Sequence, residues 1–145
     1  CGVDFSDCSI KAVQLAASIA RQSGAALSLL HVLEWPWHEP PTPAMTGVPP
    51  EQVRALIEYR EYLESGAAAR LKDIGATAMT AGPAPAVHVR FGKSYVEMLD
   101  AAREQHADLI VVGVRGRSAL DLGFFGSTTN HLVRAATCPV LTVRG

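Results

Sequence analysis

Apolar and polar residues alternate along the chain in two patterns, one typical of helices and one typical of buried strands. After a polar turn at 4–7, in which Ser6 or Asp7 can cap a helix, apolar residues recur at helical spacing as far as Gly24. Residues 26–33 form an apolar run that is too short for a surface helix, so they predict a buried strand. The first part of the chain is therefore expected to hold a helix followed by a strand.

The same two patterns continue to the end of the chain. Ser94 and Glu97 form a capping-box pattern, which indicates the start of a helix. Residues 75–86 are mostly small and predict a connection, although their first part could equally begin the next strand. The expected elements are a strand ending at Val3, a helix to Gly24, a strand at 26–33, a helix from Glu51 to Ile74, a strand at 87–91, a helix from Ser94 to Gln105, a strand at 108–112, a helix at 127–136 and a strand at 139–143.

Strands that alternate with helices predict the α/β class, because right-handed crossovers place helices on both faces of a parallel sheet. The five expected strands would form a single open parallel five-stranded sheet. The 145 residues suffice for one domain with a substantial core, so we expect 1–145 to be a single domain. Ligands of such sheets bind beyond the carboxyl ends of the strands, which directs attention to the residues after Val3 and after Val112.

A long loop is expected at 35–50, because this stretch holds six prolines and proline removes a backbone donor. Trp35 and Trp37 flank a proline within it. They could cover a ligand or form a partner surface, or they could simply pack the loop onto the domain. The sequence leaves these alternatives open.

Composition and charge exclude several functions. The net charge is −1 and the pI is near 6.6, which gives no electrostatic reason to expect nucleic acid or an anionic membrane as a partner. No apolar run approaches the roughly 18 residues that a membrane span requires. The three cysteines lack the spacing of a disulfide or metal framework, so we expect reduced thiols and a cytoplasmic location.

A glycine-rich segment, GVRGRSALDLGFFGST at 113–128, directly follows the most apolar strand. Gly113 and Gly116 would let the backbone approach a ligand, and 126–128 would open a helix whose N-terminal amides favour anions. Arg115 and Arg117 could supply positive charge. The segment therefore predicts a phosphate-binding loop. The alternative is that its glycines only turn the chain and that its serine caps a helix.

The spacing Gly-x2-Gly-x9-Gly-Ser in this segment resembles the ATP-binding branch of the universal stress proteins. The resemblance extends over nearly the whole chain, through the first strand and turn at 3–6, the strand at 30–32, the strand at 107–113 and the last strand at 138–143. It implies the strand order 3-2-1-4-5, with ATP bound where the order reverses. It also implies a homodimer through the C-terminal strand.

The resemblance also implies particular roles at the site. Asp4 and Val32 would contact the adenine and ribose end, and the glycine segment would line the rest of the nucleotide. Asp4 could instead cap the first helix, and the valines could be ordinary core residues. The residues implied for nucleotide binding are Asp4, Val32, Val112, Gly113, Arg115, Gly116, Arg117, Gly126, Ser127 and Thr128, with Thr129 a weaker candidate.

Catalytic chemistry has little support in the sequence. No general base can be placed beside the glycine segment, and His31 fits a satisfied, partly buried histidine better than a catalytic one. No metal-ligand cluster is expected, although Mg²⁺ could bind through the phosphates of ATP. We therefore expect a non-enzymatic ATP-binding stress-response or signalling domain, in which nucleotide acts as a conformational ligand. The alternatives are a slow ATP hydrolase or phosphotransferase, and a protein-interaction module without nucleotide.

Overall fold

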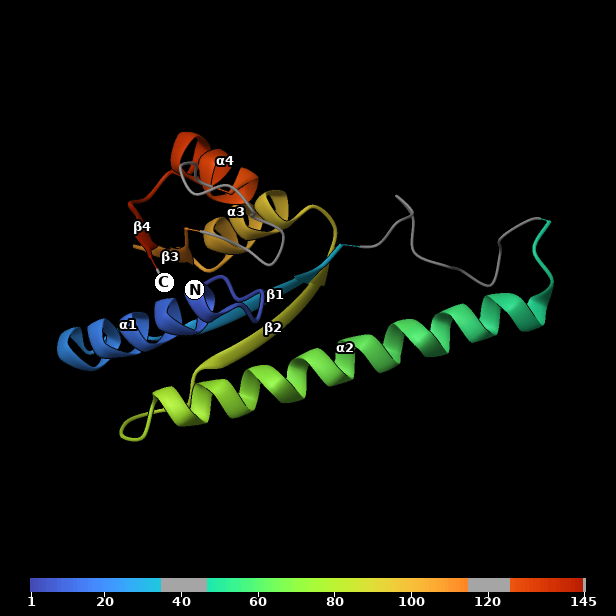
Figure 1. Cartoon of the computed structure of the whole chain (residues 1–145), viewed down its shortest axis with the longest axis horizontal. Helices are drawn as coiled ribbons and strands as arrows, with labels where there is room; N and C mark the ends of the chain where they lie inside the picture. The colour runs from blue at the N-terminus through green and yellow to red at the C-terminus, as the bar shows by residue number, and fades with distance from the viewer. Residues whose placement is uncertain (35–46, 115–125, 145) are drawn as a thin grey trace.

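The computed structural model describes residues 1–34, 47–114 and 126–144, in which helices and strands alternate (Figure 1). This alternation confirms the expected α/β class. Every helix and strand expected after Val3 is present within a few residues of its expected bounds. The elements are α1 (Asp7–Ser23), β1 (Ser28–Leu33), α2 (Pro50–Ala78), β2 (Ala86–Phe91), α3 (Ser94–Glu104), β3 (Ile110–Gly113), α4 (Ser127–Ala135) and β4 (Val140–Val143).

The strands pair in parallel as β1 with β2 and as β3 with β4, giving two two-stranded sheets. The N-terminal segment Cys1–Val3 lies between them and hydrogen-bonds to both. The backbone N–H of Gly2 donates to Val111 O at 2.9 Å, and that of Val3 donates to Leu30 O at 2.8 Å. The single five-stranded sheet in the order 3-2-1-4-5 stays a prediction, because this segment hydrogen-bonds to its neighbours without forming a strand of either sheet.

Two helices cover each face of the strands. On one face, Leu30 packs with Met98 of α3 and Leu132 of α4. On the other face, Leu29 packs with Val13 of α1 and Leu71 of α2. The alternation of neighbouring strand residues between the two faces explains why β1 is apolar on both sides. Among the described helices, none combines the length and apolar character needed to cross a membrane.

Helix α2 continues beyond the expected boundary at Ile74, through Gly75 to Ala78. The glycine does not end the helix but permits close packing. A Cβ atom on Gly75 would lie 3.3 Å from side-chain atoms of both Leu29 and Pro85. The opposite end of α2 extends well beyond the strands (Figure 1).

The expected capping box of α3 is wrong. Lys93 is the N-cap residue and makes no side-chain cap bond, while Ser94 is already helical. The backbone N–H and the hydroxyl of Ser94 both donate to Glu34, which is 60 residues away in sequence. Glu97 instead lies 3.8 Å from the Arg90 guanidinium. A distant carboxylate thus replaces the expected local cap.

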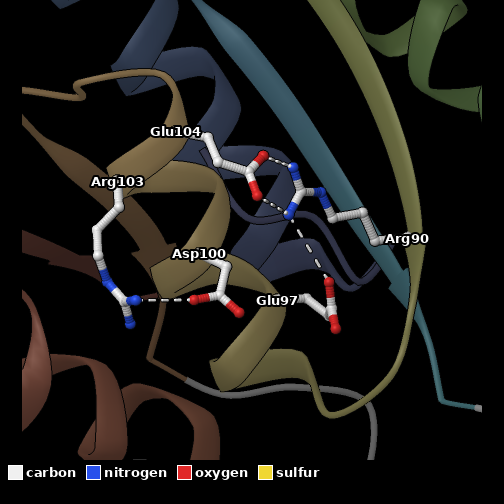
Figure 2. Close-up of polar contacts among 5 residues, drawn as sticks. All are labelled: Arg90, Glu97, Asp100, Arg103 and Glu104. Carbon is white, nitrogen blue, oxygen red and sulfur yellow. Dashed lines mark hydrogen bonds and ion pairs between the residues drawn. The ribbon is translucent and has the colours of Figure 1, made fainter.

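Ion pairs attach α3 to β2 (Figure 2). Arg90 donates two hydrogen bonds to the carboxylate of Glu104 and also faces Glu97. These hydrogen bonds raise the pKa of the Arg90 guanidinium and lower the pKa of the Glu104 carboxyl. A separate pair joins Arg103 and Asp100 at 3.0 Å on α3 itself. The Arg90 contacts hold α3 against the strand that neighbours β1.

Candidate functional site

A cavity of about 440 Å³ opens at the carboxyl ends of β1 and β3. Its size falls within the range typical of small-molecule and cofactor sites. Three of the expected site residues, Arg115, Gly116 and Arg117, lie outside the described residues. All the other expected residues line the cavity: Asp4, Val32, Val112, Gly113, Gly126, Ser127, Thr128 and the weaker candidate Thr129.

Asp4 shapes the turn that leads into α1. Its Oδ1 accepts hydrogen bonds from Ser6 N at 3.0 Å and Ser6 Oγ at 2.6 Å. Ser6, not Asp4, is the N-cap, since its Oγ accepts from Ser9 N at 3.3 Å. Asp4 therefore supports the cap indirectly while it also lines the cavity.

Phe5, between Asp4 and this cap, has a positive φ of 65°. Such a backbone conformation is unfavourable for an aromatic residue and must be held by its surroundings. The Phe5 ring lies 4.4 Å from the His31 ring, and the guanidinium of Arg70 lies 4.2 Å above it. These contacts connect α2 to the edge of the cavity.

His31 lines the cavity and is half-buried, as the sequence suggested. Its Nδ1 lies 2.7 Å from the carbonyl oxygen of Val3. Because a carbonyl only accepts, Nδ1 carries the proton in this contact. His31 is thus a satisfied histidine that also contributes to the wall of the cavity.

Gly113 is needed for packing against α1. A Cβ at this position would lie 2.9 Å from Cys8 Cβ, and 3.0 Å from both the Cys8 carbonyl carbon and Ser9 N. These atoms belong to the first turn of α1 and cannot rotate away. The Gly113 carbonyl also accepts a hydrogen bond from the buried Thr129 hydroxyl at 3.1 Å. The glycine therefore joins β3, α1 and α4 beside the cavity.

The two ends of the glycine segment meet next to this point. Gly126 N donates to Val114 O at 3.0 Å, and Val114 N donates to Val143 O at 2.8 Å. Gly126 occupies the N-cap position of α4 and provides no side-chain cap, so the suggestion that Ser127 caps the helix is wrong. The cavity wall at 126–129 is consequently a helix N-terminus, which carries partial positive charge.

The wall formed by β1 and α3 contains residues that the sequence analysis missed. Met98 adds an apolar surface beside Val32, and Glu34 and Ser94 add polar groups. Glu34 Oε1 accepts from Ser94 N at 3.2 Å and from Ser94 Oγ at 2.8 Å. The position of Glu34 directly after β1 could have identified it, because ligands of such sheets bind beyond the carboxyl ends of the strands.

The described wall of the cavity combines apolar surface with polar groups and is not basic. It contains the carboxylates of Asp4 and Glu34, the His31 imidazole and several hydroxyl groups, without a lysine or arginine among its described residues. Within the described ranges, no group of three or more His, Cys, Asp or Glu side chains is placed to hold a metal ion. Hydrogen bonding, the α4 N-terminus and apolar contact are therefore the means by which these residues can hold a ligand.

Parallel strands with helices on both faces define an α/β domain, and the cavity lies at the strands' carboxyl ends, where such domains commonly bind ligands. The model of the universal stress protein family matches residues 1–144. The chain therefore belongs to the universal stress protein family.

Individual relatives agree with this assignment. The chain is 32% identical over 142 residues to universal stress protein YxiE from Bacillus subtilis, covering 98% of this chain and 95% of that protein. Among solved structures, universal stress protein UspA from Lactobacillus plantarum has a TM-score of 0.80 and 25% identity, covering 99% of this chain and 94% of that one. A universal stress protein crystallised in complex with cAMP has a TM-score of 0.69 and 24% identity, covering 98% and 92% respectively.

Proposed function

We propose that this chain is a single stress-response domain that belongs to the ATP-binding branch of the universal stress proteins. In this proposal ATP acts as a conformational ligand. The observation that supports this most is the cavity itself. One wall is the N-terminus of α4, which suits phosphates, and the other offers the apolar side chains of Val32 and Met98, which suit a base. The cAMP complex of a structurally similar family member is consistent with an adenine nucleotide in this cavity.

In this proposal the phosphates lie at Gly126, Ser127 and Thr128, and Asp4 accepts from the ribose. Arg115 and Arg117 would supply positive charge, which the described wall lacks. Mg²⁺ would bind through the phosphates rather than through a protein cluster. A nucleotide shifts conformation only through different affinities for two states, and we propose that the proline-rich loop at 35–50 is the element that responds.

We also propose binding without turnover. The rival is a slow ATP hydrolase or phosphotransferase, which requires a base that can activate water or another acceptor. Sustained phosphate release by purified protein, above the rate with buffer alone, would establish that rival.

The proposed assembly follows from the strand pattern. Cys1–Val3, which hydrogen-bonds to both β1 and β3, would be the central strand of one sheet in the order 3-2-1-4-5. Strand β4 would then be an edge, and all its residues are only half-buried. A homodimer through β4 would cover this edge.

The three free cysteines are consistent with a cytoplasmic location.

Calorimetric titration with ATP and Mg²⁺ tests the binding proposal, using the wild type and Gly126→Val. Gly126 has φ −55° and ψ 154°, which valine adopts readily, so the fold should tolerate the substitution. We expect affinity to fall by about tenfold or more, because the added side chain blocks the phosphate approach. Gly66→Val is the matched control, since the exposed Gly66 has open space around it on α2.

Two outcomes would contradict the proposal in different ways. Unchanged affinity in a folded Gly126→Val variant would remove the phosphate-binding role of the α4 N-terminus. Absence of any ATP binding by the wild type would make the interaction module the best account of the chain.

A further inference from the structure

The two sides of the cavity differ in charge, and this difference orients a bound nucleotide. The α4 side presents a helix N-terminus, whereas the β1 side includes the carboxylate of Glu34. Phosphates are attracted to the first and repelled by the second. If the chain binds nucleotide as proposed above, the base must therefore lie on the β1 side.

The β1 side is built to accept a flat apolar group with a polar edge. Leu30 and Val32 alternate onto the same face of β1, and Glu34 directly follows the last residue of that strand. Val32 packs against the cluster that contains Leu30 and Met98, so these side chains form a continuous apolar surface. Glu34 stands at the end of that surface, where the edge of a stacked base would fall.

The carboxylate of Glu34 is oriented by the start of α3. Both of its hydrogen bonds to Ser94 end on the same oxygen, Oε1. Ser94 is held in turn because Arg90 attaches α3 to β2 through Glu104 and Glu97 (Figure 2). Among the residues that the structure describes, Oε2 of Glu34 accepts no hydrogen bond, so it is available to a donor on the ligand.

We infer that Glu34 accepts a hydrogen bond from the exocyclic amino group of the bound base and thereby selects bases that carry this group at the edge, as adenine does. A carboxylate can only accept, so an amino group satisfies it and a carbonyl in the same place is repelled. Glu34 is exposed in the free protein. Specificity arises because a bound base covers its carboxylate, and a base without the donor leaves the covered carboxylate without a hydrogen-bond partner. Glu34 is thus a specificity-determining residue within the proposed nucleotide site.

The experiment compares ATP with purine riboside 5′-triphosphate, which has hydrogen in place of the 6-amino group. Dissociation constants are measured calorimetrically for the wild type and for Glu34→Gln. The glutamine side chain keeps one oxygen, which can accept the hydrogen bonds from Ser94. Its NH₂ group, a donor, takes the place of the second carboxylate oxygen. We expect the wild type to bind ATP about tenfold or more tightly than the analogue. In Glu34→Gln this ratio should fall close to one.

The ratio separates base recognition from simple charge removal. Loss of a negative charge from the cavity strengthens binding of both triphosphates alike, so it cancels in the ratio. Glu64→Gln on the exposed surface of α2 removes a carboxylate elsewhere and should retain the wild-type ratio. A parallel titration with 2′-deoxy-ATP tests whether Glu34 contacts the ribose.

The outcomes distinguish this inference from the proposed function. If both triphosphates bind the wild type equally, or if Glu34→Gln preserves the preference, Glu34 does not read the amino group although the chain binds nucleotide. If the wild type binds ATP more tightly than 2′-deoxy-ATP, and Glu34→Gln removes that difference but still prefers ATP to the purine riboside analogue, Glu34 contacts the ribose and the inference is overturned. If no nucleotide binds the wild type, the proposed function itself fails.

Discussion

Replacement of Gly113 by alanine tests the packing of β3 against α1. The added methyl group would lie 2.9 Å from Cys8 Cβ and 3.0 Å from two backbone atoms of the same helical turn. A Cβ has no rotamer, and its neighbours are fixed by the helix, so the strain must be relieved by a shift of α1 or β3. Gly113 has no positive φ, so backbone conformation itself does not demand glycine.

The magnitude follows from the nature of these contacts. Overpacking a well-filled site costs about 1–3 kcal/mol of unfolding free energy. The clash involves backbone and Cβ atoms rather than the tip of a flexible side chain, so we expect about 2 kcal/mol for Gly113→Ala. Gly66→Ala provides the control, because its Cβ would meet nothing within 4 Å on the exposed part of α2. The control should gain about 0.5–1 kcal/mol from helix propensity.

Urea unfolding followed by circular dichroism measures both variants. The midpoint and the slope are compared with those of the wild type, because an unchanged slope shows that the stability itself has changed. If Gly113→Ala unfolds within about 0.5 kcal/mol of the wild type at an unchanged slope, the close approach of β3 and α1 is not a constraint on this fold.

Two further substitutions test contacts around the same site. Thr129→Val removes the hydroxyl that donates a hydrogen bond to Gly113 O. Because Thr129 is buried, we expect the unfolding free energy measured in urea to fall by about 1 kcal/mol. An unchanged unfolding midpoint would show that this hydrogen bond does not stabilise the fold. Arg90→Gln removes the partner that lowers the pKa of the Glu104 carboxyl. Because the pKa of Glu104 is lowered in the folded state, the ionised carboxylate stabilises the fold at pH values above its ordinary pKa of 4.5. This stabilisation is lost as the pH falls and the carboxylate is protonated. The difference in unfolding free energy between the wild type and Arg90→Gln should therefore become smaller in acid. A gap that stays constant from about pH 7 to pH 3 would contradict the ion pair.

Local sequence patterns were sufficient to predict the order of the described elements. Helical spacing and short apolar runs depend on neighbours along the chain, and they located all four described helices and all four described strands. The ends of elements were harder to predict. Gly75 resembles a helix stop in the sequence, but the reason for the glycine is the approach of Leu29 and Pro85 from other elements.

The candidate site was predictable where its residues follow strand ends. Asp4 and Gly113 stand at such ends, and the structure brings them to one cavity. Glu34 also follows a strand, but its contact with Ser94 joins residues 60 positions apart, and no local pattern reveals that contact or the place of Ser94 in the cavity wall. The Ser94–Glu97 pattern was misleading because Glu97 forms an ion pair with Arg90 of another element and does not cap the start of α3.

Gly113 has two possible roles, packing and ligand approach, and thermodynamic linkage can separate them. A ligand that binds only the folded state adds stability that depends on its concentration relative to its dissociation constant, about 2.7 kcal/mol at a hundredfold excess. If Gly113 serves packing alone, a fixed concentration of ATP should add equal stability to the wild type and to Gly113→Ala. If the glycine also contacts nucleotide, the increment should be smaller in the variant. Because Gly113 itself lines the cavity in which we propose that the nucleotide binds, we expect the smaller increment.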